Sequence, residues 1–180
     1  DYIGEAGITH YYRVRSINPD NGRTGIWSSI VTATSSEFDS EGFLTEVQEA
    51  GFRYFYNYAY PESHLPREGI KAKKSWHPKL MSVVSTGMYF FNIAVGIERG
   101  FISRAEGAAH VEILLNFLHD KTERFYGAYP HWIDGANGKV RPFSSTDNGA
   151  DLVESGIVAE GLIFAREYFS RDTTTESNIR

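Results

Sequence analysis

Two carboxylate side chains, Asp151 and Glu154, stand three residues apart at the start of a long apolar run, DNGADLVESGIVAEGLIFAREYF. In a helix this spacing puts both carboxylates on one face, with Cβ atoms about 5–6 Å apart. Paired carboxyl groups can carry general acid–base chemistry. A structural interpretation also exists, because acidic residues in a first turn stabilise the helix dipole and Asp147 or Asn148 is a suitable N-cap. The pattern predicts either a functional pair or a solvated, capped helix start.

The irregular segment from Phe125 to Asp147 leads into this helix. It combines aromatic residues, glycine, proline and an Asn-Gly turn. Loops of this length are usually functional or disordered, and the aromatic residues argue against disorder. We therefore expect side chains of the site in this segment, with His131, Trp132 and Arg141 as candidates.

Composition excludes several classes of function. The net charge is −5 with no basic run, so neither a nucleic-acid surface nor an anionic-membrane surface is indicated, and a neutral substrate fits better. There is no cysteine, and His110 and His119 are nine residues apart, which puts them on opposite faces of a helix. We therefore expect no metal site and no cofactor. No apolar run reaches the ~20 residues of a membrane span. The 12 Phe, 11 Tyr and 3 Trp are more than a core of this size needs and suit an aromatic-lined concave site.

The elements that must position these residues change type along the chain. Two runs rich in Tyr, Val and Ile, THYYRVRSI and IWSSIVTAT, flank turn residues and predict a β-hairpin within residues 1–36. From residue 37 to residue 180 the apolar spacing becomes helical, so the fold class is mainly α. Helix boundaries are indicated by Asp39 or Ser40, by Gly100, and by capping-box patterns at Ser103–Glu106 and Thr173–Glu176.

The hairpin region resembles the end of a fibronectin type III domain. The order YYRVRSINPDNGRTGIWSSIVTAT is similar to the last two strands of that β-sandwich, with a Tyr-containing strand, a Gly-bearing turn and a WS strand. Tyr11 or Tyr12 is then either the corner tyrosine or an ordinary strand aromatic. The resemblance implies that residues 1–36 are the C-terminal strands of a fibronectin type III-like domain.

The helical region resembles the bacterial glucoamylase-like glycoside hydrolases, a group that includes endo-β-1,2-glucanases. The resemblance rests on VGIERGFISRAEGAAHVEILLNFL, followed in the same order by GAYPHW, GKVRPFS and DNGADLVES. It implies that residues 37–180 are the first part of an (α/α)6 barrel that acts on a neutral β-glucan or oligosaccharide, in the periplasm or outside a bacterial cell. Because such a barrel is several hundred residues long, the partners would be the carbohydrate and the remainder of the same enzyme.

The resemblance also implies roles for individual residues. Asp151 and Glu154 would be catalytic, on one wall of the site, with the opposing carboxylate elsewhere in the enzyme, because glycoside hydrolysis needs carboxyl groups on both sides of the sugar. The residues expected to bind substrate are Asp147, Trp132, His131, Arg141 and Trp76. Trp132 and His131 could instead be rim anchors, and Asp147 could be an N-cap. Arg141 could position Asp147 or Asp151, or only cap a carbonyl. Tyr129 and Phe143 are expected to pack.

The sequence departs from the family pattern at one point, and two other functions compete with glycoside hydrolysis. Where relatives commonly have Asp-Arg after the first helix, this chain has PREG, so the role of that Asp does not transfer. A non-catalytic carbohydrate-binding or assembly module would have the aromatics without paired acids. A polysaccharide lyase on a similar barrel would need basic residues to neutralise uronates, which the charge disfavours.

Overall fold

The computed structural model describes residues 5–69, 78–142 and 144–180. The chain divides into two compact units, Asp1–Glu46 and Val47–Arg180. The boundary lies within the first helix, α1 (Ser40–Asn57). Most of the described residues in regular structure are helical, which confirms the predicted mainly α composition. Among the described helices, none is both long and apolar enough to cross a membrane.

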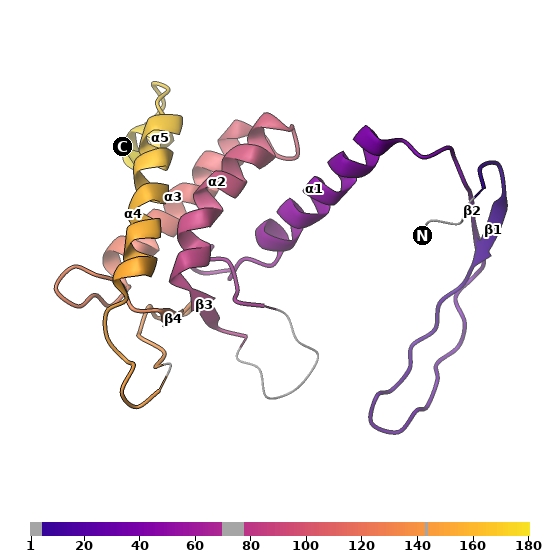
Figure 1. Ribbon diagram of the computed structural model, residues 1–180, viewed down its shortest axis with the longest axis horizontal. Helices are drawn as coiled ribbons and strands as arrows, with labels where there is room; N and C mark the ends of the chain where they lie inside the picture. The colour runs from indigo at the N-terminus through magenta and orange to yellow at the C-terminus, as the bar shows by residue number, and fades with distance from the viewer. Residues whose placement is uncertain (1–4, 70–77, 143) are drawn as a thin grey trace. The chain divides into compact units, whose positions relative to one another are not determined.

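The first unit contains the predicted β-hairpin. Strands β1 (Thr9–Tyr12) and β2 (Val31–Thr34) pair antiparallel, with Thr9 opposite Thr34 and Tyr12 opposite Val31 (Figure 1). Farther toward the turn, the Trp27 ring lies close to two cations, with the guanidinium carbons of Arg13 and Arg15 at 4.2 and 4.5 Å from its centroid. The hairpin itself is therefore confirmed.

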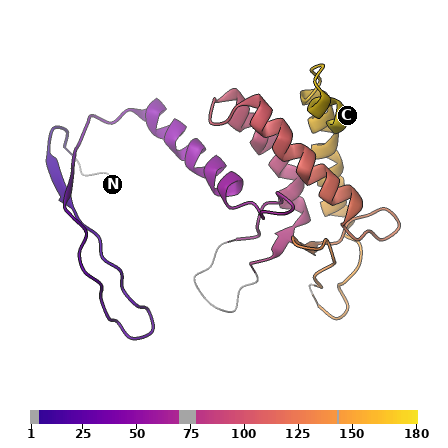
Figure 2. The same cartoon turned by 180° about the vertical axis from the view of Figure 1, so that it is seen from behind.

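The second unit is a group of helices with a two-stranded sheet at one end. Its strands, β3 (Leu80–Ser82) and β4 (Trp132–Asp134), pair antiparallel although they lie far apart in the sequence. Figure 2 shows α3 on the side opposite to the view of Figure 1. The helices after α1 are α2 (Val83–Glu98), α3 (Arg104–Asp120), α4 (Leu152–Tyr168) and α5 (Thr174–Ile179).

The expected helix boundaries are largely confirmed. The capping box of Ser103 and Glu106 is present at the start of α3, and the Thr173 side chain caps α5. Helix α2 ends at Glu98, just before Gly100, which adopts a positive φ of 73°. Local sequence signals therefore determine where these helices begin and end.

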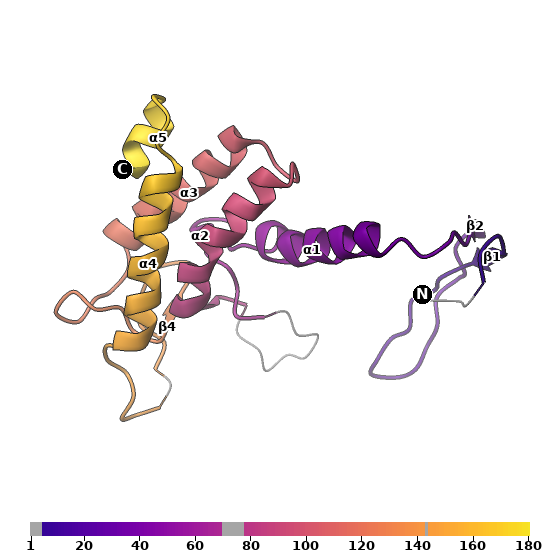
Figure 3. The same ribbon diagram turned by 45° about the horizontal axis from the view of Figure 1, so that its top comes forward.

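Helices α2 and α4 lie side by side, and two glycines allow their close approach (Figures 1 and 3). A side-chain carbon at Gly87 would collide with the backbone of Ile157 and Val158. A side-chain carbon at Gly161 would collide with the carbonyl oxygen of Gly87. This close contact brings the N-terminal ends of both helices to the same end of the unit, beside β3 and β4.

The far end of α4 is held by a buried ion pair. Arg104 donates from Nε and Nη2 to the Glu176 carboxylate at 2.8 and 3.0 Å, and Nη2 also donates to the Tyr168 carbonyl at 2.5 Å. The Tyr168 hydroxyl donates to Glu98 Oε1 at 2.7 Å. Since the Glu176 side chain is 4% exposed, this pair is shielded from solvent. The arginine of the ISRAE motif therefore links α3, α4 and α5.

The glycine contact generates the first prediction. Gly161→Ala is expected to lower the free energy of unfolding by about 1–3 kcal/mol, because the added methyl group has no room between α2 and α4. Gly156→Ala, on the same helix, is the matched control, since nothing lies within 4 Å of the position of its added carbon. The control is expected to raise stability by about 0.5–1 kcal/mol. Urea unfolding measures both, and equal stabilisation by the two substitutions would contradict the close α2–α4 contact.

Candidate functional site

Asp151 is the N-cap of α4. Its Oδ1 accepts hydrogen bonds from the backbone N–H groups of Val153 and Glu154, both at 3.0 Å. A carboxylate in this position satisfies N–H groups that have no partner within the helix. The sequence allowed an acidic residue to cap this helix, and the residue that does so is Asp151 itself.

The predicted cap at Asp147 or Asn148 is wrong. Helix α4 begins only after Asp151, whose backbone is extended and whose N–H donates to the Tyr129 carbonyl at 2.8 Å. Asp147 lies in an exposed turn, where its backbone N–H donates to Ser144 Oγ at 3.1 Å. Both residue types cap helices well, so the local sequence does not distinguish them, and a contact with a distant segment determines the start of the helix.

Glu154 reaches from α4 to the start of α2. Its Oε2 accepts a hydrogen bond from the backbone N–H of Val84, in the first turn of α2. The Ser82 side chain caps the same helix by accepting from the Ser85 N–H at 3.4 Å. Glu154 is only 6% exposed. A buried carboxylate is therefore placed at a helix N-terminus, where the helix dipole favours negative charge.

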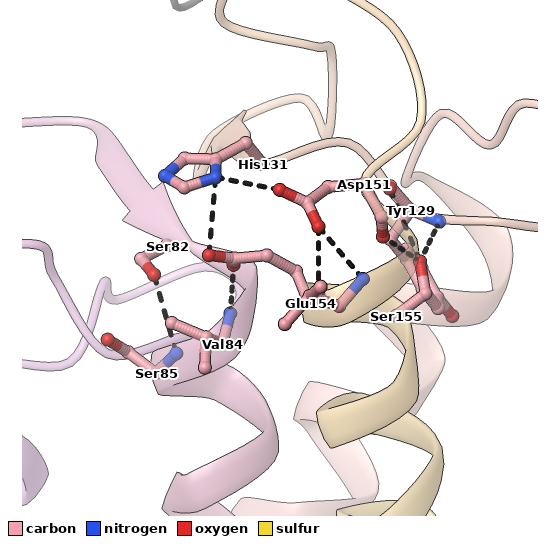
Figure 4. A network of polar contacts seen from close by, with 9 residues as sticks. Ser82, Val84, Ser85, Tyr129, His131, Asp151, Glu154 and Ser155 are labelled. Atoms are coloured by element: carbon pink, nitrogen blue, oxygen red, sulfur yellow. Dashed lines mark hydrogen bonds and ion pairs between the residues drawn. The ribbon is translucent and has the colours of Figure 1, made fainter.

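His131 lies between the two carboxylates. Its Nδ1 is 3.0 Å from Asp151 Oδ2 and 3.3 Å from Glu154 Oε1 (Figure 4). The imidazole is held by backbone pairing, because the residue precedes β4 and its carbonyl accepts from the Val83 N–H at 3.1 Å. Each carboxylate thus uses one oxygen for a helix N-terminus and turns the other toward the same imidazole nitrogen.

The surroundings of the two acids separate their pKa values. The N–H of Glu154 and the His131 imidazole hold the pKa of the Asp151 carboxyl below its usual range. Burial raises the pKa of Glu154, and the negative charges of Asp151 and Glu68 add to this effect. The Val84 N–H and His131 oppose it without cancelling it. Asp151 therefore favours the carboxylate, while Glu154 keeps its proton to a higher pH than an ordinary glutamate.

The same three residues are the donor set that a divalent cation would use. One ligand atom from each of His131, Asp151 and Glu154 lies within 4.8 Å of the others. In the structure these atoms contact one another, and each acid also binds a helix N–H. A cation bound here would have to replace the contacts that the imidazole makes with the two acids.

Arg141 has a partner that the sequence did not indicate. Its Nη2 pairs with the carboxylate of Asp134, a residue that is 3% exposed and that also accepts from the Ala136 N–H at 2.9 Å. From the sequence, Arg141 is expected to bind substrate, to position Asp147 or Asp151, or to cap a carbonyl. The structure places it beyond the turn that follows β4, where its backbone N–H donates to the Trp132 carbonyl at 2.8 Å and its guanidinium pairs with a buried acid.

The aromatic candidates fall into three groups. Trp132 is half-buried and lies edge-on to the His131 ring, with centroids 5.2 Å apart. Tyr129 packs against the core, as expected, and its N–H donates to Ser155 Oγ at 2.8 Å. Trp76 and Phe143 lie outside the described residues.

Sequence reasoning missed two participants in this site. Glu68, in the PREG sequence, is close enough to Glu154 for its charge to act on that carboxyl. Val84 contributes only a backbone N–H, so no side-chain pattern could have indicated it. For Glu68 a signal existed, because it lies in the PREG segment that the sequence already singles out.

No protein-family model matches the chain. A curated exo β-1,2-glucooligosaccharide sophorohydrolase (non-reducing end) from Parabacteroides distasonis is 38% identical over 181 residues. The match covers 100% of this chain and 24% of that protein, so the chain spans about a quarter of the length of this relative.

The solved structures that match the chain are also glucanases and glucoamylase-like proteins. A β-1,2-glucanase from Parabacteroides distasonis matches with a TM-score of 0.81 and 38% identity, covering 100% of this chain and 25% of that one. An endo-β-1,2-glucanase from Chitinophaga pinensis, in complex with sophorotriose and glucose, matches with a TM-score of 0.72 and 35% identity, covering 79% and 34%. A candidate glucoamylase from Bacteroides uniformis matches with a TM-score of 0.75 and 37% identity, covering 81% and 35%. The homologues of this chain are therefore glucoamylase-like proteins and β-1,2-glucanases, as its sequence motifs predicted.

Proposed function

We propose that this chain is part of a glycoside hydrolase that cleaves the O-glycosidic bonds of a neutral β-glucan, with β-1,2-linked glucan as the first substrate to test. The observation that carries the proposal is the cluster of Asp151, Glu154 and His131 at the adjoining ends of α2 and α4. The choice of substrate rests on the homologues, which include a β-1,2-glucanase and a sophorohydrolase.

The two acids suit different tasks. Glycoside hydrolysis requires a carboxylic acid that protonates the leaving oxygen. Burial raises the pKa of Glu154, so it is the better proton donor, whereas Asp151 stays ionised and orients its neighbours. Pairs of carboxyls whose environments separate their pKa values are a common way to assign such roles.

Both acids belong to one side of the proposed site. One oxygen of each acid lies within 4.8 Å of an oxygen of the other, whereas catalytic carboxyls in glycosidases are about 5–5.5 Å apart when retaining and 6.5–9.5 Å apart when inverting. Since both turn toward one imidazole, a sugar cannot lie between them. The opposing carboxylate is proposed to come from the part of the enzyme outside this chain.

The wider architecture follows the same proposal. Residues 37–180 would be the N-terminal part of an (α/α)6 barrel, and residues 1–36 the last strands of a fibronectin type III-like domain. Such an enzyme would work in the periplasm or outside the cell, on carbohydrate bound across the adjoining ends of α2 and α4. Among the residues proposed to bind substrate, Trp132 and His131 lie at the cluster, Arg141 contacts Asp134, and Asp147 lies in the exposed turn.

A second candidate function is a non-catalytic carbohydrate-binding module. It is favoured by one observation: each of the two acids accepts hydrogen bonds at a helix N-terminus, so a structural role alone would explain their presence. The two functions differ in what happens when an acid is replaced by its amide, because an amide oxygen can still accept the capping hydrogen bond.

The second prediction uses this difference. In the intact enzyme, Glu154→Gln and Asp151→Asn are each expected to lower turnover of β-1,2-glucan by about 10²–10⁴-fold, because a positioned proton donor or ionised carboxylate is lost. The melting temperature should change little, since the capping oxygens remain. Glu160→Gln, on the exposed face of α4, is the matched control and should keep normal turnover. Near-normal hydrolysis by both acid variants would show that neither acid is catalytic, and would favour a carbohydrate-binding role for this part of the enzyme.

The third prediction concerns Trp132. If its ring is a platform for a glucosyl unit, Trp132→Ala weakens binding of β-1,2-glucooligosaccharides while the melting temperature stays close to that of the wild type, because aromatic rings recognise apolar sugar faces. Calorimetric titration and thermal unfolding of the same preparation measure the two quantities. A large fall in melting temperature, with binding lost only through unfolding, would identify Trp132 as a structural anchor instead.

The fourth prediction concerns the chain by itself. Large apolar side chains on the helices of the second unit are exposed, including Met88 at 56%, Ile163 at 55% and Leu152 at 79%. Apolar patches beyond a few hundred Å² mark interfaces or aggregation sites. We expect residues 1–180 alone to be inactive and to self-associate or to bind the rest of the enzyme. A monodisperse 20.3 kDa monomer that hydrolyses β-glucan would contradict this.

A further inference from the structure

The Nδ1 atom of His131 is the point to which both acids turn. Asp151 Oδ2 lies at 3.0 Å and Glu154 Oε1 at 3.3 Å from this nitrogen. Figure 4 shows the ring approaching the two carboxyls from the side of β3 and β4, with Asp151 and Glu154 approaching from α4. The imidazole, from the segment before β4, therefore connects two acids that both belong to the start of α4.

The contacts determine which nitrogen carries a proton. The ionised Asp151 carboxylate can only accept hydrogen bonds, so the Nδ1 atom that lies 3.0 Å from its Oδ2 must carry a proton. The position of the ring is set by the backbone: the His131 carbonyl is held by the Val83 N–H at 3.1 Å, at the start of α2. The Nδ1–H group is thus hydrogen-bonded to Asp151 and held within ion-pair distance of Glu154.

We propose that His131 is a positioning residue, whose Nδ1–H fixes the carboxyls of Asp151 and Glu154 relative to each other and shields each from the charge of its neighbour. The sequence predicts substrate binding for His131, which is a different role with different kinetic consequences. The proposal rests on the proposed function, because positioning has a kinetic effect only if the two acids take part in a reaction.

The charges around Glu154 give the proposal a direction. The groups that act on its carboxyl are His131 from the segment before β4, Asp151 at the start of α4, Glu68 from the segment before β3, and the Val84 N–H of α2. Removing the imidazole takes away a group that lowers the pKa of Glu154 and leaves two carboxylate charges that raise it. Removing the charge of Asp151 does the opposite. The two substitutions should therefore shift the pH dependence of activity in opposite directions.

The experiment measures kcat, KM and the pH profile of β-1,2-glucan hydrolysis by the intact enzyme. For His131→Ala we expect kcat to fall by about 10²-fold with KM nearly unchanged, because misplacing reacting groups affects the chemical step. The limb of the profile governed by Glu154 should move to higher pH. For Asp151→Asn the same limb should move to lower pH, measured on the residual activity.

Two further variants separate positioning from a general loss of structure. His131→Asn keeps an N–H donor near the position of Nδ1, so it should recover part of the lost rate and move the limb back toward the wild-type position. His119→Ala removes a histidine that also contacts an aspartate, Asp120 at 2.7 Å, but on an exposed part of α3, so its kinetics and pH profile should match the wild type.

A readout without activity tests the same contact. Nitrogen-detected NMR of the wild-type imidazole should show His131 protonated at Nδ1, with a slowly exchanging proton that is lost in Glu154→Gln combined with Asp151→Asn. This spectrum decides the proposal even if the wild-type enzyme hydrolyses no glucan, a result that would instead reject the proposed function.

Several outcomes would overturn the inference. A rise in KM without a fall in kcat in His131→Ala would return His131 to substrate binding. An unchanged pH profile in an active His131→Ala enzyme would show that the imidazole does not act on Glu154. A wild-type spectrum with the proton on Nε2 alone would show that the ring donates to neither acid.

Discussion

The candidate site depends on the close contact between α2 and α4. Gly87 and Gly161 remove the side chains that would keep the two helices apart. Because the helices approach at this point, the Glu154 carboxyl on α4 can reach the first turn of α2. A bulkier residue at either glycine would move the two helix starts apart and separate the acid from its N–H partner.

This arrangement partly compensates the cost of burying the Glu154 carboxylate. Burial of a carboxylate is unfavourable unless hydrogen bonds and nearby charges compensate it. Here the compensation is partial: Glu154 receives the Val84 N–H and the His131 imidazole, but Asp151 and Glu68 add like charge, and the pKa of Glu154 stays raised. Asp151, with two N–H groups and the same imidazole, has its pKa lowered. One imidazole and two helix ends thus give neighbouring acids opposite preferences for a proton.

The sequence predicted the elements better than it predicted the contacts between them. Helix starts with local caps, such as Ser103 and Thr173, were predictable because the capping side chain lies within a few residues of its N–H partner. The cap of α4 was not, because Asp147, Asn148 and Asp151 all belong to residue types that cap helices well, and a contact with Tyr129 chooses among them.

The candidate site shows the same limit. Asp151 and Glu154 were selected from their spacing, and His131 and Trp132 from their loop, so the residue types were available from the sequence. Their grouping was not, because it depends on β3 and β4, two three-residue strands that are too short to have a readable periodicity. The partner of Arg141 was unpredictable for a related reason: Asp134 is seven residues away across a turn whose geometry the sequence does not specify.

The most direct test of this account is a crystal structure of the intact Glu154→Gln enzyme with a β-1,2-linked glucooligosaccharide. The account predicts a sugar across the adjoining ends of α2 and α4, with a glycosidic oxygen within hydrogen-bonding distance of the substituted side chain at position 154 and the Asp151–His131 contact preserved at about 3 Å. A sugar bound elsewhere, with the side chains at positions 151 and 154 covered by protein and engaged only as helix caps, would contradict it.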